Sequence, residues 1–303
     1  MAETRRAHVI VNARSGTITP DAAERVEKHL AGAGWQARID IARTGAELVR
    51  AADAAAASDA DVIVAGGGDG TIATIAAAVA DTGRHFGVLP LGTFNYFAQR
   101  LGIPTDLDEA LVVLTTGTVR PIGVGDVNGR MFLNNSGIGL YPAVLRQREQ
   151  TYRRVGRSQI AAYVSAAVSL MKPRGLLNLQ LRVDGEPLSR RTSLLFVGAN
   201  PTQLAAFDIP GEECIASGRL VIYITQPLPP GRLLTLAART FIRGLHGAGE
   251  LEVVCGREVV VTLRRKRVRI ALDGEIVRLH APLRYRFREA ALQVIAGPVP
   301  AAP

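Results

Sequence analysis

Short β-branched runs alternate with longer segments of helical periodicity over residues 7–116, and this rhythm constrains the fold more than any other feature. It is typical of βαβ units, in which helices cover a parallel sheet. Loops that follow the strands of such a sheet gather at one edge, where ligands bind. The expected strands are 8–12, 37–41, 62–65 and 86–89, helices are expected to begin near Thr44, Thr71 and Asp106, and the loops 12–16, 66–71 and 91–95 should converge.

After Gly117 the pattern changes to strand pairs joined by tight turns. Asn128-Gly129 and Asp184-Gly185 are both dipeptides that favour two-residue hairpin turns. We therefore expect a second, mainly antiparallel β domain. The expected domains are 1–120 and 121–282, with about 283–300 returning to the first; helical patterns at 141–171 and 230–243 interrupt the second, and further strands are expected at 251–254, 259–263 and 268–272.

The chain has 303 residues and a net charge of +9, from 36 Lys and Arg against 27 Asp and Glu. The positive charge is clustered at 146–157 and 264–269. Such an excess favours polyanionic partners without identifying them, because nucleotide phosphates, nucleic acid and an anionic membrane surface all attract it. Solvated arginines of a basic proteome are the alternative.

The two cysteines, Cys214 and Cys255, are far apart in sequence and form no C-x-x-C motif. The chain is therefore expected to rely on apolar burial for stability and to occupy a reducing cytoplasm. Its first residues lack the apolar core of a secretory signal, so export is not expected. The apolar stretch 160–171 is shorter than the roughly 20 residues that cross a bilayer, so no membrane span is expected.

The loop from Gly66 to Thr71 reads Gly-Gly-Gly-Asp-Gly-Thr, between an expected strand and an expected helix. Backbone N–H groups of such a turn approach anions closely and the helix dipole adds to the attraction, which makes phosphate the natural ligand. A tight turn without a ligand is the alternative. Asp69 would repel a phosphate unless a cation intervenes, so it indicates Mg²⁺, bound directly or through water. A simple cap of the helix at Thr71 is the alternative for Asp69.

Gly68, Gly70 and Ala73 also match the dinucleotide fingerprint G-x-G-x-x-A. That fingerprint normally follows the first strand and is followed about 20 residues later by an acidic residue. Here it follows the third expected strand, and the next strand ends in Val88-Leu89-Pro90. A Walker A loop is absent as well, because no Gly-Lys-Ser/Thr follows.

Gly67-Gly68-Asp69-Gly70-Thr71 is followed by a second motif, Pro90-Leu91-Gly92-Thr93-Phe94-Asn95-Tyr96-Phe97-Ala98. Together they resemble the diacylglycerol kinase catalytic-domain family, in particular its soluble bacterial lipid kinases, which are related to sphingosine kinases. Segments 12–16, 134–139 and 272–275, with Thr44, fall in the expected order. The resemblance implies an α/β fold with an N-terminal Rossmann-like domain similar to phosphofructokinases and NAD kinases, a C-terminal antiparallel β-sandwich domain, and ATP in the cleft between them.

The resemblance also implies roles for individual residues. Asp-Gly-Glu occurs at 184–186, where a plain hairpin is preferred, and at 273–275, where the family carries its catalytic carboxylate. Glu275 is the implied base on the acceptor hydroxyl, Asp273 is second, and Asp69 is the implied ligand of the catalytic Mg²⁺. Helix caps remain alternatives for Thr44 and Thr93. The implied ATP ligands are Asn12, Ser15, Gly16, Thr44, Gly67, Gly68, Asp69, Gly70, Thr71, Thr93 and Asn95.

Three positions depart from the family pattern. Ala13 replaces a usual proline. Ser217 stands where relatives commonly place an aspartate that helps to bind a structural Mg²⁺, so a structural metal near Ser217 and Arg219 is in doubt. The stretch from Gln203 to Phe207 replaces a glycine-rich segment, which reshapes the loop on the acceptor side.

These features predict an ATP-dependent lipid kinase, a phosphotransferase with an alcohol acceptor such as a diacylglycerol-like or other long-chain lipid. ATP and Mg²⁺ are the expected cofactors, and the lipid is expected at an anionic membrane surface that the cytoplasmic protein meets peripherally. Alternatives are a nicotinamide-dependent oxidoreductase, an NAD kinase-like phosphotransferase and a non-catalytic nucleic-acid binder. Nucleic acid is not an expected partner, because residues 257–283 contain no aromatic side chain for stacking. A homodimer stays open.

Overall fold

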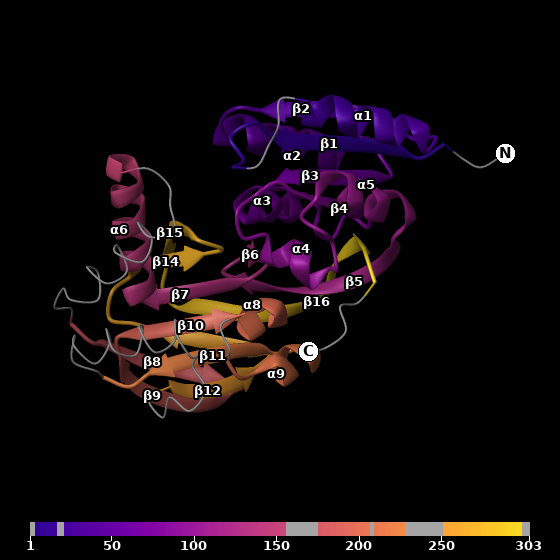
Figure 1. Cartoon of the computed structure of the whole chain (residues 1–303). Coiled ribbons are helices and arrows are strands. Elements are labelled where there is room, and N and C mark those ends of the chain that lie inside the picture. The colour runs from indigo at the N-terminus through magenta and orange to yellow at the C-terminus, as the bar shows by residue number, and fades with distance from the viewer. Residues whose placement is uncertain (1–3, 17–20, 156–174, 207–208, 228–250, 299–303) are drawn as a thin grey trace. The chain divides into compact units, whose positions relative to one another are not determined.

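A computed structural model describes residues 4–16, 21–155, 175–206, 209–227 and 251–298 of the chain (Figure 1). The chain forms two compact units: unit 1 contains residues 1–124 and 289–303, and unit 2 contains residues 125–288. The helical pattern at 230–243, the apolar stretch 160–171 and Phe207 lie outside the described residues. In the described part of the chain, no helix combines the length and apolar character that crossing a bilayer requires.

Unit 1 is built on a parallel sheet. Strand β1 (Arg6–Asn12) lies between β2 (Gln36–Ala42) and β3 (Val62–Gly67), and β4 (His85–Pro90) follows β3. The end of β16 (Leu283–Ala296) pairs parallel with β4 through Gln293 and Val294. All four strands expected from the alternating pattern are confirmed, each two residues longer than expected.

Five helices are described in unit 1: α1 (Ala22–Gly32), α2 (Gly45–Ala57), α3 (Asp69–Val79), α4 (Tyr96–Arg100) and α5 (Leu107–Thr116). Thr44 caps α2, because its hydroxyl accepts the Glu47 N–H at 3.2 Å. Asp106 caps α5 in the same way. Helix α3 begins two residues before the expected Thr71, because Gly68 takes the extended N-cap conformation.

The strand order β2-β1-β3-β4 reverses its direction at β1. Right-handed crossovers then place α1 on one face of the sheet and both α2 and α3 on the other. The loops that leave β1 and β3 therefore turn to opposite faces. In open α/β sheets this switch point, at the carboxyl ends of the strands, is where ligands bind.

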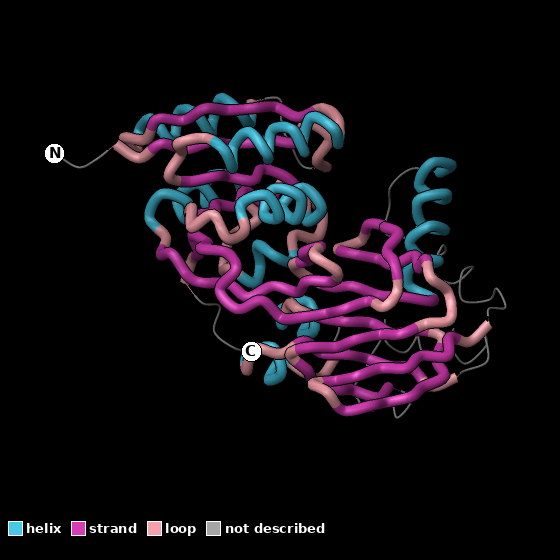
Figure 2. The backbone as a smooth tube through the Cα atoms, turned by 180° about the vertical axis from the view of Figure 1, so that it is seen from behind, coloured by secondary structure: helices cyan, strands magenta, loops and turns pink. Residues whose placement is uncertain are grey.

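Unit 2 is a sandwich of antiparallel sheets, and strands dominate it in Figure 2. One sheet contains β9 (Glu186–Thr192), β8 (Leu177–Val183), β13 (Glu258–Thr262) and the first residues of β16. The other has the order β12 (Leu251–Gly256), β11 (Leu220–Thr225), β10 (Leu194–Gly198), β7 (Asn135–Gly139), β14 (Arg267–Leu272) and β15 (Glu275–His280). The hairpin β5 (Thr118–Val127) to β6 (Arg130–Phe132), the helices α8 (Pro201–Ala206) and α9 (Glu212–Ala216), and α6 (Leu140–Val155), which lies beside β14 and β15, complete the described elements.

The core of unit 2 is formed by alternate residues of the two sheets. Leu179, Leu181 and Val259 face Ile138, Ile222 and Ile270 in one cluster of buried side chains. Successive strand residues point to opposite faces. In β8 the alternate residues are exposed, whereas every residue of β11 is buried. The expected α/β fold with an antiparallel β-sandwich is confirmed.

Hairpin turns in unit 2 use a left-handed Asn or Asp followed by glycine. Asn128 has φ 51° and Asp184 has φ 49°. Their side chains also accept backbone N–H groups of neighbouring segments: Asn128 from Arg284 at 2.7 Å, and Asp184 from Glu258 at 2.8 Å. The hairpin expected at Asp184-Gly185 is confirmed, and it joins β8 to β9.

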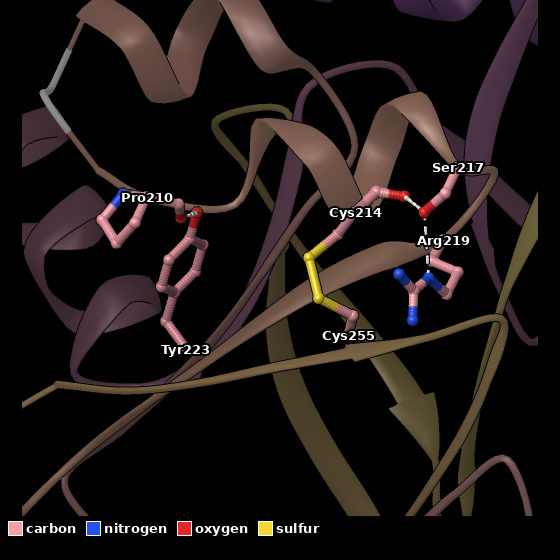
Figure 3. Close-up of a disulfide and its surroundings, with 6 residues drawn as sticks. All are labelled: Pro210, Cys214, Ser217, Arg219, Tyr223 and Cys255. Carbon is pink, nitrogen blue, oxygen red and sulfur yellow. Dashed lines mark hydrogen bonds between the residues drawn. A yellow bond between two sulfur atoms is a disulfide. The ribbon is translucent and has the colours of Figure 1, made fainter.

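Cys214 and Cys255 are joined by a disulfide between α9 and β12 (Figure 3). The expectation that the chain does without a covalent cross-link is wrong, because the fold brings together two residues separated by 41 positions. Beside the disulfide, Tyr223 donates from its hydroxyl to the Pro210 carbonyl at 2.7 Å. Burial, with the nearby charges of Glu213 and Glu212, raises the pKa of Tyr223 above its usual value. The pairing removes the cysteine-based reason for expecting a reducing compartment.

Reduction of the Cys214–Cys255 bond should lower the stability of unit 2. A cross-link that closes a loop of this length lowers the conformational entropy of the unfolded chain, which stabilises the folded state by about 3–4 kcal/mol. Thermal unfolding followed by circular dichroism, with and without a reductant, should show a lower melting temperature in the reduced protein. A Cys214→Ala/Cys255→Ala variant should melt low and ignore the reductant. Equal melting of the reduced and oxidised protein would contradict a stabilising cross-link.

Candidate functional site

Three loops of unit 1 meet at the carboxyl edge of its parallel sheet. A Cβ added to Gly68 would lie 3.2 Å from the Cα of Gly92, and one added to Gly92 would collide with Gly68. A Cβ on Gly16 would lie 3.5 Å from the Thr93 hydroxyl oxygen. The expected convergence of loops 12–16, 66–71 and 91–95 is therefore confirmed, and it requires glycine where two backbones touch.

The loop after β1 is tied to α3 by side chains. Asn12 donates from Nδ2 to the Thr71 hydroxyl oxygen at 2.8 Å and accepts the Arg14 N–H at 3.0 Å. Thr71 also covers Gly67, where its side chain leaves no room for a Cβ. The Ala13 N–H donates to the Ala42 carbonyl, so the same loop reaches the end of β2. Thr44 follows two residues later as the cap of α2.

Asp69 joins the glycine-rich loop to α4. Its carboxylate accepts the Phe97 N–H at 3.1 Å and the Tyr96 N–H at 3.4 Å. Asp69 is the first residue of α3, and its side chain accepts these N–H groups at the start of α4. A negative charge at the N-termini of two helices is favoured by both helix dipoles.

Asn95 shapes the third loop from within. It is 3% exposed and has φ 53°, a left-handed conformation. Its Oδ1 accepts the Gly92 N–H at 3.0 Å, while Nδ2 donates to the carbonyls of Gly92 and Pro90. Asn95, and not Thr93, occupies the N-cap position of α4. Of the residues expected around a nucleotide, Asn95 and Thr71 thus act in building the loops.

Ser15 is the polar group that these loops leave unsatisfied. Its hydroxyl oxygen is buried and has no hydrogen-bond partner among the described residues. The first N–H groups of a helix such as α3 also lack intrahelical acceptors. A phosphate would satisfy such donors, so the residues present fit a nucleotide phosphate.

The two remaining candidate carboxylates, Asp273 and Glu275, lie in unit 2, at the turn between β14 and β15. Asp273 has φ 43° and accepts three backbone N–H groups: Leu133 at 2.7 Å, Asn134 at 2.8 Å and Asn135 at 3.0 Å. Its own N–H donates to the Asn135 carbonyl at 2.9 Å. Asp273 therefore locks the turn to the start of β7, a role that the sequence did not reveal.

Glu275 follows in the same turn but is arranged differently. It is exposed, and its carboxylate has no hydrogen-bond or ion-pair partner among the described residues. It is paired across the hairpin with Leu272. Of the two carboxylates considered for the base, the exposed one is available to a substrate hydroxyl, and the other is engaged with backbone.

Buried amide side chains lie near the three backbone hydrogen bonds of Asp273, which we call the Asp273 clamp. Asn200 donates to Asn134 Oδ1 at 2.6 Å, and Asn135 donates to Gln203 Oε1 at 2.7 Å. Asn135 Oδ1 has no partner among the described residues. Gln203, noted only as a departure in the sequence, is thus part of this network and is 7% exposed. Next to it, burial raises the pKa of Tyr285 to about 12, and its hydroxyl lies 3.1 Å from that of Ser136.

Ser217 and Arg219 are engaged with each other and with a backbone carbonyl in the structure. The Ser217 hydroxyl donates to the Cys214 carbonyl at 2.8 Å and accepts from Arg219 Nε at 3.0 Å (Figure 3). A guanidinium at this position opposes a bound metal. In the described part of the chain, no group of three or more His, Cys, Asp or Glu side chains is placed to hold a metal ion.

Known proteins are similar to this chain in sequence and in fold. Residues 6–127 match the family model of the diacylglycerol kinase catalytic domain. The chain is 28% identical to a diacylglycerol kinase of Bacillus subtilis (strain 168), over 89% of this chain and 90% of that protein. It is 25% identical to a diacylglycerol kinase of Staphylococcus aureus (strain JH9), over 78% of this chain and 76% of that protein.

A crystal structure of a diacylglycerol kinase from Bacillus anthracis str. Sterne has the same fold, with a TM-score of 0.76 and 20% identity, over 98% of this chain and 99% of that one. The matched domain contains all three converging loops of unit 1. The aligned relatives extend this similarity through the sandwich unit. Residues 6–127 therefore match the diacylglycerol kinase catalytic domain, and the chain as a whole is similar in sequence and fold to proteins described as diacylglycerol kinases.

Proposed function

We propose that this protein transfers the γ-phosphate of ATP to the hydroxyl group of a diacylglycerol-like or other long-chain lipid. The observation that carries the proposal is the phosphate cradle of unit 1, formed by the three converging loops, where Gly68 meets Gly92 and Asp69 ties the glycine-rich loop to α4. The family supplies the reaction class, a kinase with an alcohol acceptor. Unit 1 holds the phosphate donor in this proposal, and the Glu275 turn of unit 2 receives the acceptor.

On the donor side, backbone N–H groups and the Ser15 hydroxyl bind and orient the phosphates. Asp69 would hold Mg²⁺, directly or through water, since carboxylate oxygens are the ligands that this ion prefers. When bound, Mg²⁺ neutralises charge on the phosphates. The loop contacts of Asn12 and Asn95 keep the donors in place before the nucleotide arrives.

On the acceptor side, Glu275 orients the lipid hydroxyl and accepts its proton. Asp273 is a positioning residue, because its three backbone contacts fix the turn that carries Glu275. A base within hydrogen-bond reach of the hydroxyl contributes about 10²–10⁴ to the rate.

The membrane is the proposed meeting place with the lipid. Strand β14 separates Arg264–Lys266, the first residues of the basic cluster 264–269, from the Asp273 turn by about 20 Å, so these residues do not flank that turn. Exposed cations instead line one face of the β14–β15 hairpin, where Arg267 pairs with His280 and Arg269 with Arg278. Ile276, 38% exposed, lies on the same face near Glu275. Arginines near an anionic surface each stabilise binding by about 1 kcal/mol.

A panel of acceptors with γ-labelled ATP tests the proposed reaction. Label should enter a long-chain alcohol such as diacylglycerol, in the presence of Mg²⁺, and should remain absent from NAD. The Glu275→Gln variant in the same assay controls for contaminating kinases. Transfer to NAD, or ATP hydrolysis without labelling of any lipid, would contradict a lipid kinase.

Substitutions in the β14–β15 turn should separate the base from the clamp. Glu275→Gln should lower kcat by about 10²–10⁴ and leave unfolding unchanged, because the side chain is exposed and makes no contact to lose. Asp273→Asn should lower the free energy of unfolding by about 1–3 kcal/mol, because an amide N–H then faces a backbone N–H. Urea unfolding and initial rates measure both.

Asp184→Asn provides the matched control, because Asp184 occupies an equivalent turn and also accepts backbone N–H groups. It should cost stability without changing kcat. Full activity in Glu275→Gln would remove that residue from the reaction.

Asp69→Asn tests the role of Asp69 beyond its cap. The variant should need at least about tenfold more Mg²⁺ for half-maximal turnover, because an amide is a weaker metal ligand than a carboxylate. Asp106→Asn is the control, since Asp106 caps α5 through two backbone N–H groups far from any phosphate motif in the sequence. If both variants lose stability alike and keep the Mg²⁺ dependence of the wild type, Asp69 is a cap alone.

A further inference from the structure

An open groove of about 510 Å³ lies on the sheet of unit 2 that contains β8, β9 and β13. It contains no acidic side chain, and it shares no residue with the phosphate cradle of unit 1 or with the Glu275 turn. Its lining residues are Asn178, Leu179, Gln180, Ser189, Arg190, Arg191, Thr262, Leu263 and Arg264.

The strand register places hydrogen-bond donors of the groove side by side. Asn178 is paired with Arg191, and Gln180 is paired with both Ser189 and Thr262. Directly paired residues of antiparallel strands lie on the same face, and all five of these are exposed. Amide, hydroxyl and guanidinium groups therefore share one surface.

Arginines extend this surface along the sheet. The next row on the same face contains Arg182 and Arg284, which both pair with Val260 and are both exposed. Arg264 lies at the other end, in the loop that follows β13. The face is therefore basic over several strands, beyond the limits of the groove itself.

Among the described residues, acids neutralise only one of the arginines that line the groove. Arg190 forms two hydrogen bonds of 2.7 Å with Glu252, and this contact holds the pKa of Glu252 below its usual value. Glu252 is thus occupied by Arg190 and does not oppose an anion in the groove. Arg191 and Arg264 have no carboxylate partner among the described residues.

We propose that this groove binds the phosphate group of anionic phospholipid headgroups and docks unit 2 on the membrane independently of the acceptor lipid. The planar guanidinium matches phosphate oxygens in a bidentate geometry, and the amide and hydroxyl donors fit the remaining oxygens. A volume of this size is that of a small-molecule site and accommodates one headgroup. A free phosphate ester shares the same chemistry, but the arginines that continue along the sheet exceed what one small anion can engage.

Vesicle binding tests the site without any turnover. Full-length wild-type protein and an Arg191→Ala/Arg264→Ala variant are sedimented with vesicles of phosphatidylcholine mixed with phosphatidylglycerol. The variant should partition about 25-fold more weakly, which is about fivefold for each arginine. On vesicles of phosphatidylcholine alone, the two proteins should behave alike.

The matched control is Arg50→Ala/Arg130→Ala, which removes two exposed arginines that lie outside the groove. It should bind anionic vesicles nearly as the wild type does. Equal partition of the groove variant and this control would overturn the proposal. Equal turnover of the wild type and the groove variant in neutral detergent micelles is also expected, and a selective loss there would assign the groove to catalysis and overturn the docking role.

Soluble glycerol 3-phosphate and single-stranded RNA test other occupants. If glycerol 3-phosphate binds the wild type and not the groove variant while both bind vesicles equally, the groove belongs to a free phosphate ester and the lipid assignment fails. The same pattern with RNA at physiological salt would also overturn it. An inactive wild type in micelles, by contrast, would contradict the kinase proposal alone, because vesicle partition needs no reaction.

Discussion

Carboxylates that accept backbone N–H groups hold the candidate site residues in place within each of the two units. Asp69 fixes α4 against the glycine-rich loop in unit 1, and Asp273 fixes the β14–β15 turn against the start of β7 in unit 2. Hydrogen bonds to an ionised acceptor are about twice as strong as those between neutral groups. Without these hydrogen bonds, the loop conformations would depend on the conformational preference of the chain alone. The bonds of each carboxylate therefore order the loops before any substrate binds.

Within the β14–β15 turn, one carboxylate stabilises the backbone and a second one is available for the reaction. The carboxylate oxygens of Asp273 accept three backbone N–H groups. Glu275, two residues later, is therefore the exposed carboxylate of the turn. Asp184 shows that the clamp needs no catalytic context: it has the same left-handed turn and contacts Arg257 and Glu258 in the same way. A proton acceptor benefits from such support, because a base held at a fixed distance from its hydroxyl loses less entropy on reaction.

The sequence predicted features that depend on neighbours along the chain. The four strands of unit 1, the helix start near Asp106, the helix cap given as an alternative for Thr44, and the hairpins at Asn128 and Asp184 follow from local periodicity and turn chemistry. Partners distant in sequence were missed. The contact of Asp69 with Tyr96 and Phe97, the disulfide and the Asn135–Gln203 bond all join segments whose separation hides them from local patterns. The glycine at 92 carried a usable signal, because a glycine beside a second glycine-rich loop implies close backbone approach.

The net charge of +9 acquires a location in unit 2. Exposed cationic side chains lie on the outer face of β14–β15 and on the sheet that carries the groove, whereas Arg190 is paired with Glu252. Unpaired arginines repel each other and stabilise neither sheet, so a folded chain retains them at a cost that a polyanion can offset. An enzyme whose acceptor stays in a bilayer gains from this, because attraction to the surface raises the local concentration of a substrate that cannot diffuse to it. The proposed reaction at a membrane surface would account for a charge that is neutral or unfavourable for folding.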